Sequence, residues 1–387
     1  MRGTTRGLPT TIRAKVGPLV NGGESMTTIF NVRPRTTNIG NDVIAMAGLA
    51  LMERAVGATV NMVTLPAMAA GGGTLGSGLS AKNIYEINQL ADGVIIGGGN
   101  LLENGALNLD TAALGSLQVP MMLFSVSSGQ IRNRSGRLAA RTDSMAKDKV
   151  LHLCAQADPI LARDRATAAH LEAIGASRVR TSGCPTLFLD ETMPNLSRAG
   201  EDLTKSVLIS VRHPRLMSIP YSMQGRIYPD VRRIIDFVRG KGHDSIRLLC
   251  HDYQDLPFAA AFPDVPVLYT EDALRFLAWV KGAFLNITYR LHAFLPCLSY
   301  GTPSINISYD QRAESLIDTV GFSAWDINMF RSHDMMADLN DRYGSLALLP
   351  ELRRQAQPIW QELKGTLTDG FTKFARRVDA YRQTRVF

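Results

Sequence analysis

Short apolar runs rich in β-branched residues alternate along the chain with longer stretches of helical periodicity. The short runs predict strands at 28–31, 59–64, 93–96, 121–126, 207–211, 246–250, 267–269, 283–288 and 304–308. The longer stretches predict helices at 41–56, 140–156, 164–174, 228–241, 271–280, 291–300 and 311–320. This alternation is typical of an α/β protein in which helices cover mostly parallel sheets.

A polar segment near the middle of the chain separates two such α/β units. It contains Pro194 and Gly200, which favour a linker over a helix or strand. The segment before the first strand is basic and lacks an apolar run, and the last part of the chain has the pattern of one or two amphipathic helices. The predicted divisions are a flexible basic tail at 1–25, an N-terminal Rossmann-like domain at 26–190, a linker at 191–204, a C-terminal Rossmann-like domain at 205–345 and C-terminal helices at 346–387.

The composition is that of a soluble globular protein. Of 387 residues, 45% are apolar and 20% are charged, which excludes a disordered chain. The net charge of +7 raises the question of an anionic partner. Its basic residues are spread along the chain, so we expect small anions in a cleft and no nucleic acid. No apolar stretch is long enough to span a membrane, and the four cysteines have neither paired nor metal-type spacing, so a cytoplasmic location is expected.

Polar and glycine residues follow most of the predicted strands. In an open parallel sheet, ligands bind outside the carboxyl ends of the strands, so these residues are expected to meet at one cleft between the two sheets. They are Asn38, Gly40 and Asn41 after the first strand, Gly98, Gly99 and Asn100 after 93–96, Arg212 and His213 after 207–211, His251 after 246–250, Arg290, Leu291 and His292 after 283–288, and Tyr309 and Asp310 after 304–308. Neither glycine-containing turn matches the dinucleotide or ATP fingerprint, so NAD and ATP are not indicated.

Arg290 and His292 are the strongest chemical signal in the sequence. Singly, Arg290 could form an interdomain salt bridge, and His292 could bond to a backbone carbonyl. Their occurrence in the same half as Arg212 and His213 favours an anion site instead. A metal site built from these histidines, His251 and Asp252 has no supporting ligand spacing, so no metal is expected.

Several short motifs occur together in a specific order. They are Asn38-Ile39-Gly40-Asn41, Val94-Ile95-Ile96-Gly97-Gly98-Gly99, Ala162-Arg163-Asp164-Arg165, Arg290-Leu291-His292, Gly301-Thr302-Pro303 and Ile307-Ser308-Tyr309-Asp310. Over roughly residues 28–325 the chain resembles the polysaccharide pyruvyltransferase family. The resemblance implies a GT-B-like fold with two Rossmann-like domains facing a cleft and C-terminal helices packing back on the first domain. It also implies transfer of a pyruvyl group from phosphoenolpyruvate to a sugar of a bacterial surface polysaccharide or its lipid-linked precursor, forming a ketal.

The resemblance also implies roles for individual residues. Arg290, Leu291 and His292 would lie at the phosphoenolpyruvate site, and Arg163 and Asp164 would contribute to substrate binding. Phosphoenolpyruvate carries a phosphate and a carboxylate, so we expect Arg212 and Arg290 to act as a pair of cationic groups. A histidine with a pKa near neutrality can donate or accept a proton, so His292 is expected to transfer it, with His213 and His251 as helpers.

One departure from the family pattern lies after Tyr309-Asp310. Relatives usually have a lysine there, whereas this chain has Gln311-Arg312, so the positive charge is displaced by one residue.

The expected partners are phosphoenolpyruvate as donor and a saccharide or lipid-linked oligosaccharide as acceptor, with no cofactor. Contact with the inner face of the membrane and a homo-oligomer are both left open. One alternative is a GT-B glycosyltransferase with a nucleotide-sugar donor, in which Arg290 would hold the diphosphate and Glu271 or Asp310 the ribose. Another is a non-catalytic protein that binds a glycan or a partner.

Overall fold

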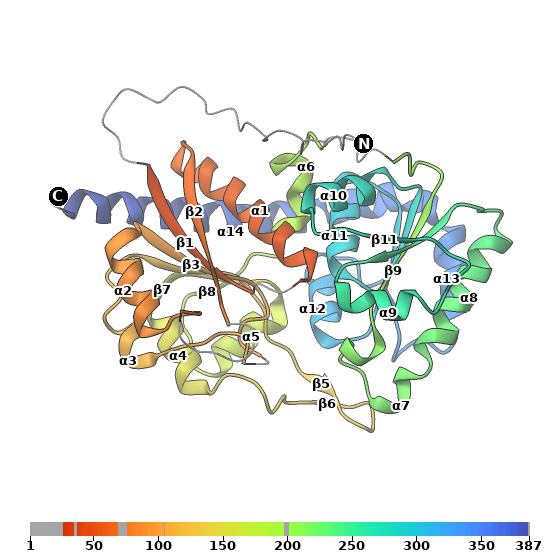
Figure 1. Cartoon of the computed structure of the whole chain (residues 1–387), viewed down its shortest axis with the longest axis horizontal. Helices are drawn as coiled ribbons and strands as arrows, with labels where there is room; N and C mark the ends of the chain where they lie inside the picture. The colour runs from red at the N-terminus through yellow and green to blue at the C-terminus, as the bar shows by residue number, and fades with distance from the viewer. Residues whose placement is uncertain (1–25, 35–36, 69–75, 104, 197–200, 386–387) are drawn as a thin grey trace, which may run out of the picture.

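Two parallel six-stranded sheets lie side by side and form the core of the protein (Figure 1). The computed structural model describes residues 26–34, 37–68, 76–103, 105–196 and 201–385. The predicted tail and part of the predicted linker, 197–200, lie outside these residues. The two sheets confirm the α/β class, and their arrangement follows from apolar runs that are buried on both faces.

The first sheet has the strand order β2-β1-β3-β4-β7-β8, with every neighbouring pair parallel. A short antiparallel hairpin leaves it after β4 and extends below the sheets towards the second half (Figure 1). The elements of this half are β1 Thr27–Arg33, α1 Ile39–Val56, β2 Val60–Pro66, α2 Ala81–Leu90, β3 Gly93–Gly99, α3 Thr111–Leu114, β4 Met121–Val126, β5 Ile131–Arg132, β6 Leu138–Ala139, α4 Lys147–Gln156, β7 Ala157–Ala162, α5 Arg165–Ala173, β8 Val179–Thr181 and α6 Leu189–Thr192.

The second sheet has the order β11-β10-β9-β12-β13-β14 and is also parallel throughout. Its elements are β9 Val207–Val211, α7 Tyr221–Gln224, α8 Ile227–Gly240, β10 Ile246–Cys250, α9 Leu256–Ala259, β11 Val267–Tyr269, α10 Ala273–Gly282, β12 Leu285–Thr288, α11 Leu291–Tyr300, β13 Ser304–Ser308, α12 Gln311–Thr319, β14 Ile327–Asn328 and α13 Met335–Gly344.

Each sheet has one point at which the strand order reverses. In the first sheet β1 lies between β2 and β3, and in the second β9 lies between β10 and β12. Connections diverge to opposite faces at such a point and leave a crevice beyond the carboxyl ends of the two strands. The segments after β1 and β3, and those after β9 and β12, are therefore the places where the fold itself favours a ligand site.

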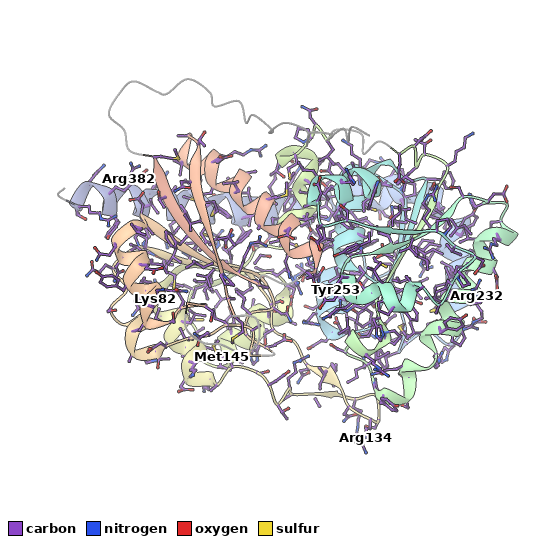
Figure 2. All side chains as sticks on the ribbon, in the orientation of Figure 1. Lys82, Arg134, Met145, Arg232, Tyr253 and Arg382 are labelled. Atoms are coloured by element: carbon purple, nitrogen blue, oxygen red, sulfur yellow. The ribbon has the colours of Figure 1, made fainter. Side chains whose placement is uncertain are left out.

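A single long helix, α14 Leu349–Thr384, joins the two halves (Figure 1). On the second half, the indole Nε1 of Trp360 donates to the carbonyl of Val320 at 2.8 Å. On the first half, the ring of Phe371 meets that of Phe124 edge-on at 5.1 Å. Arg382, near the end of α14, donates to Oγ1 of Thr27 at the start of β1 at 2.7 Å (Figure 2). The predicted packing on the first domain is thus present, and the same helix also holds the second.

Some elements differ from those that the sequence predicts. The helix expected over 140–156 begins only at Lys147. The elements without a counterpart among those predicted are α2, α3, β5, β6, β7, β8, α6, α7, α9, β14 and α13. Pro159 explains the omission of β7, because proline within an apolar run argues against an inner strand. The pairing of β4 with β7 shifts register between Ala157 and Ile160, where Pro159 lies. In the part of the chain that the structure describes, no helix is long and apolar enough to cross a membrane.

Candidate functional site

The N-terminus of α1 packs directly on the strand ends of the second sheet. Asn38 caps the helix, and its side chain accepts the N–H of Gly40 at 3.2 Å. The N–H of Ile39, the first residue of the helix, donates to the carbonyl of His251 at 2.9 Å across the domain boundary. A β-carbon at Gly40 would lie 2.3 Å from Nδ1 of His292, so only glycine allows this approach. The segments after β1, β10 and β12 therefore meet, as the strand-end argument expects.

The glycine turn at the end of β3 also packs against α1. A β-carbon at Gly98 would come within 2.2 Å of Ile44 in α1, and Gly99 has a φ of 103° that side chains rarely adopt. A β-carbon at Gly99 would also be 3.5 Å from Oδ1 of Asn41. These glycines let α1 pack closely against β3, and Asn100 follows them with its side chain half-buried. The contacts named for Gly98 and Gly99 are thus with α1, and these glycines serve the packing of that helix on β3.

Arg290 lies immediately before α11 and is buried against Asp255. Its side chain is 6% exposed, and its Nη2 lies 3.2 Å from Oδ2 of Asp255, a carboxylate with no exposure. The other oxygen of Asp255 accepts the N–H of His213 at 2.9 Å. Arg212, after β9, donates through Nε to the carbonyl of Leu216 at 3.1 Å. Asp255 thus braces the segments that follow β9 and β12 in the second sheet.

The imidazole of His292 is held in its neutral form. Its Nε2 is buried and has no hydrogen-bond partner among the described residues. Burial, and then the positive charges of Arg163 and Arg290, lower the pKa of His292 to about 3. The sequence-based expectation of a pKa near neutrality is therefore wrong for this structure, because the charged ring would be desolvated between two guanidinium groups.

His251 lies behind His292 and is also neutral. Its ring packs edge-on against Phe276 at 4.7 Å, and its Nε2 lies 3.3 Å from Oγ of Ser210. Burial lowers the pKa of His251 well below its ordinary value, and the charges of Arg290 and Arg212 lower it further. The Nδ1 atom of His213 accepts the N–H of Arg215 at 3.1 Å.

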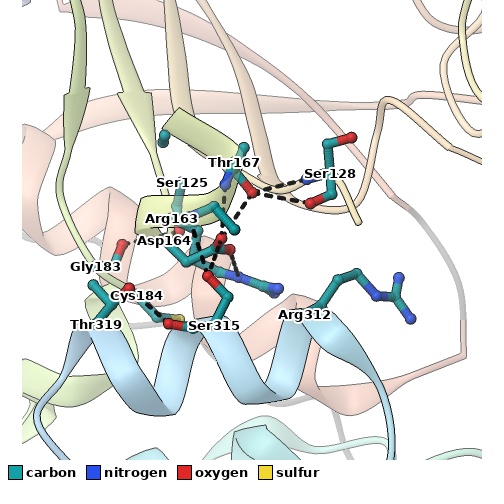
Figure 3. Close-up of polar contacts among 12 residues, drawn as sticks. Ser125, Ser128, Arg163, Asp164, Thr167, Gly183, Cys184, Arg312, Ser315 and Thr319 are labelled. Atoms are coloured by element: carbon teal, nitrogen blue, oxygen red, sulfur yellow. Dashed lines mark hydrogen bonds and ion pairs between the residues drawn. The ribbon is translucent and has the colours of Figure 1, made fainter. Parts of the chain in front are cut away.

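Arg163 and Asp164, at the end of β7, have different surroundings (Figure 3). Oδ1 of Asp164 accepts the N–H of Thr167 at 2.9 Å and the hydroxyl of Ser315 in α12 at 2.8 Å. Asp164 therefore caps α5 and also links the two domains through Ser315. Arg163 is 5% exposed, and its Nε lies 3.7 Å from Asp164 without a hydrogen bond in the described chain. Of this pair, Arg163 places its charge near His292.

Asp310 and Arg312 connect the second domain to the first. Asp310 caps α12 by accepting the N–H of Ala313 at 2.8 Å, and it accepts a bond from Nη2 of Arg312 at 2.9 Å. Nη1 of the same arginine lies 3.4 Å from Oε2 of Glu103 in the first domain. Tyr309 is buried beside them, and burial raises the pKa of its hydroxyl. Arg312, which carries the positive charge that is displaced by one residue from the family pattern, thus lies at the domain boundary.

Sequence reasoning missed two acids of this site, Asp255 and Glu103. Asp255 lies five residues beyond the end of β10, and Glu103 lies four residues beyond the end of β3. Both follow strands whose ends were identified, so the same rule, applied over a longer segment, could have found them. Leu291, the first residue of α11, is half-buried between Arg290 and His292.

A polar cavity of about 220 Å³ lies on a different face of α12. Glu314, Asp326 and Arg331 are among its lining residues. Both carboxylates are already hydrogen-bonded, Glu314 to Arg132 and Arg331 and Asp326 to two side chains of β13. Because these groups satisfy one another, this cavity offers less to an anion than the interdomain cluster does.

The interdomain cluster has the properties of an anion-binding site. Buried side-chain nitrogen atoms without hydrogen-bond partners in the described ranges come from both domains, and they are Nε of Arg163, Nη1 of Arg212, Nδ1 of His251 and Nε2 of His292. Nη2 of Arg290 is ion-paired with Asp255. Buried donors are normally paired, so such a group of unpaired ones indicates a ligand that accepts hydrogen bonds. Cations from two domains would suit a ligand with two anionic groups.

Two Rossmann-like domains around a shared arginine-rich site define a GT-B-like α/β protein. A model of the polysaccharide pyruvyl transferase family matches residues 38–311, and the chain belongs to this family. The predicted family and the predicted fold are therefore confirmed. The match covers the segments after β1, β3, β7, β9, β10, β12 and β13, which supply the cluster.

Solved structures of other proteins share this fold. The S. aureus MnaA–UDP co-structure is 12% identical, with a TM-score of 0.51, and the match covers 93% of this chain and 96% of that one. UDP-N-acetylglucosamine 2-epimerase from Rickettsia bellii is 11% identical, with a TM-score of 0.53, and the match covers 93% and 99% of the two chains. At these identities the likeness shows the fold alone. No curated protein sequence matches the chain.

Proposed function

We propose that the protein transfers a pyruvyl group from phosphoenolpyruvate to a saccharide and forms a ketal. The observation that supports this most is the set of buried nitrogen atoms without hydrogen-bond partners on Arg163, Arg212 and His292, beside the buried guanidinium group of Arg290. Phosphoenolpyruvate presents a phosphate and a carboxylate on a three-carbon unit, and guanidinium groups bind both through paired hydrogen bonds. The family to which the chain belongs supports a saccharide as the acceptor.

Arg212 and Arg290 would hold one anionic group of the donor, and Arg163 the other. The first two follow β9 and β12, at the reversal point of the second sheet, and Arg163 reaches the site from the first domain. Asp255 contacts Nη2 of Arg290 at 3.2 Å and fixes the guanidinium group beside the site. Both domains are then required for donor binding.

His292 would deliver the proton to the methylene carbon of the donor. The ring is neutral in this structure, with a pKa of about 3, because burial and two arginines disfavour the cation. A ligand with several negative charges bound between those arginines would offset their effect and raise the pKa. Donor binding would thereby convert His292 from a neutral ring into a proton donor.

Ketal formation would join two hydroxyl oxygens of the acceptor to C2 of the donor. The first oxygen adds to C2 while C3 takes a proton, and the second displaces phosphate, which leaves with the proton of that second hydroxyl. The acceptor we propose is a sugar of a surface polysaccharide or its lipid-linked precursor. Approach to a lipid-linked acceptor would involve contact with the membrane surface, and assembly of several copies of the chain is compatible with this scheme.

The carboxylates suggested for a nucleotide-sugar donor are differently engaged. Asp310 accepts bonds from the N–H of Ala313 and from Arg312, and exposed Glu271 accepts the hydroxyl of Tyr269 at 3.0 Å. Neither carboxylate therefore favours a ribose site.

The test is incubation of the purified protein with phosphoenolpyruvate and a panel of saccharides and lipid-linked saccharides. We expect phosphate release together with the pyruvyl mass increment on an acceptor, and loss of both in H292Q. An active preparation that modifies acceptors from a nucleotide sugar, and never from phosphoenolpyruvate, would refute the proposal. H152N changes an exposed histidine of α4 and is the matched control.

A further inference from the structure

Glu103 is a buried carboxyl group that the donor site does not use. It lies in the loop after β3, in the first domain, and is 1% exposed. Its Oε2 lies 3.5 Å from Nε of Arg141 and 3.4 Å from Nη1 of Arg312. Because Arg141 belongs to the first domain and Arg312 to the second, the carboxyl group lies at the boundary between them.

Neither arginine depends on Glu103 for a partner. Arg312 is closer to Asp310, at 2.9 Å, and Arg141 makes two contacts of 2.8 Å with Asp143. A carboxylate in a dry site costs free energy unless it is fully paired. Glu103 is incompletely paired, because its buried Oε1 makes no hydrogen bond of good geometry in the described part of the chain, although the amide of Gly129 is close enough to lower the pKa of the carboxyl group. Salt bridging alone therefore does not account for an acid at this position.

The surroundings of Glu103 make it a stronger base than an exposed glutamate. Burial raises its pKa, and the lowering effects of Arg312, Arg141 and the amide of Gly129 do not cancel this. The negative charge of Asp310 raises the pKa further. A carboxylate with a raised pKa takes a proton from a hydroxyl more readily than an ordinary one.

Glu103 is connected to the donor-binding residues through Arg312 and Asp310. The carboxylate of Asp310 pairs with Arg312, which contacts Glu103. The positive charge of Arg163 also lowers the pKa of Asp310, so Asp310 lies near both Arg312 and Arg163. Arg163 in turn is one of the two cations that affect His292. The unpaired oxygen thus belongs to the same buried cluster but comes from the opposite domain to Arg290.

We propose that Glu103 is the general base that activates the acceptor hydroxyl, an inference that rests on the proposed function. As the acceptor oxygen forms its bond to C2 of phosphoenolpyruvate, the hydroxyl proton passes to Oε1 of Glu103. The electrons of the enol double bond form a C–H bond at C3 with the proton from His292. One proton is gained by the carboxylate and one is lost by the imidazolium, and exchange with solvent restores both groups.

The principal variant is E103Q, which keeps the shape of the side chain and removes its basicity. We expect the turnover number for pyruvyl transfer to fall by about 10²–10⁴-fold, the usual contribution of a general base. Binding of phosphoenolpyruvate, measured by calorimetry, should stay close to that of wild type. D143N is the matched control, because it removes an exposed carboxylate that contacts Arg141 and should leave turnover unchanged.

The pH profile separates a catalytic role from a structural one. A base works only when ionised, so turnover should fall with decreasing pH on an acidic limb set by the raised pKa of Glu103. E103D keeps the carboxyl group and should keep this limb at lower turnover, which provides a test even where E103Q does not fold. A folded E103Q with near wild-type turnover, or an E103D profile without the limb, would overturn the inference. Absence of phosphoenolpyruvate turnover in the wild type would instead contradict the proposed function.

Discussion

Gly40 and His292 touch across the boundary between the two domains, and a single added carbon on the glycine would lie 2.3 Å from the imidazole Nδ1. The contact makes the position of the proposed proton donor depend on a helix of the other domain. It also explains why glycine lies in the first turn of α1, where its conformational freedom alone would be a disadvantage.

The variant G40A is expected to displace His292 and reduce pyruvyl transfer. The added carbon would also lie 2.8 Å from Cβ of His292, so ring rotation alone cannot relieve the clash and α1 must move away from α11. A shift of about 1 Å typically costs about 10²-fold in rate. The matched control is G365A in α14, where an added carbon meets nothing within 4 Å and should stabilise the helix slightly. Equal kinetics in the two variants would contradict this role for the contact.

Arg290 and Asp255 should contribute to stability and donor binding in separable ways. R290A leaves a carboxylate with no exposure unpaired, so we expect the free energy of unfolding to fall by about 3–5 kcal/mol in urea denaturation. The double variant R290Q/D255N removes both charges, and the new amide oxygen in place of the Asp255 carboxylate can still accept the N–H of His213. The double variant should therefore regain most of the stability that R290A loses, but it should not bind phosphoenolpyruvate. Donor binding in this double variant would show that Arg290 is not part of the donor site.

Donor binding should be accompanied by proton uptake at His292. The pKa of about 3 leaves the ring neutral at pH 7, and a bound polyanion would raise this pKa so that a proton is taken from solvent. Calorimetry in buffers of different ionisation enthalpy measures this uptake directly. We expect more protons taken up by the wild type than by H292Q, with the difference growing as the pH falls from 7 to 6. Identical uptake by the two proteins would mean that His292 does not titrate on binding.

Ser315 should stabilise the domain interface without affecting the chemistry. Its hydroxyl donates to Asp164 at 2.8 Å and accepts the N–H of Ala166 at 3.2 Å, so S315A loses two bonds across the boundary (Figure 3). The expected loss is about 1–3 kcal/mol of unfolding free energy. The KM for phosphoenolpyruvate should change little, since Arg163 does not depend on this hydroxyl for its position at the end of β7. A large rise in KM with unchanged stability would argue that Asp164 and its partners contact the donor.

The sequence allows the strand ends of the site to be predicted because parallel strands all deliver their carboxyl ends to one edge. That rule brings Arg212, His251 and Arg290 together without knowledge of side-chain packing. It gives no information on contacts between domains, so the approach of Gly40 to His292, and the low pKa that follows from burial there, could not be predicted.

The sequence analysis missed two acidic residues of the site, Asp255 and Glu103, for a different reason. Asp255 reaches Arg290 from a short helical turn at 253–255, and Glu103 reaches Arg312 from a loop, so neither directly follows its strand. Their roles depend on which arginines they meet in three dimensions, and spacing along the chain does not encode this. β7 was missed because Pro159 lies within its apolar run, which shows how one residue can conceal an inner strand.

Calorimetric titration of the protein with phosphoenolpyruvate shows whether the interdomain cluster binds this donor. We expect saturable binding to wild type, to S315A and to G365A, and none to the folded double variant R290Q/D255N. Tight binding of a UDP-sugar by a folded wild-type protein that gives no response to phosphoenolpyruvate would contradict this expectation.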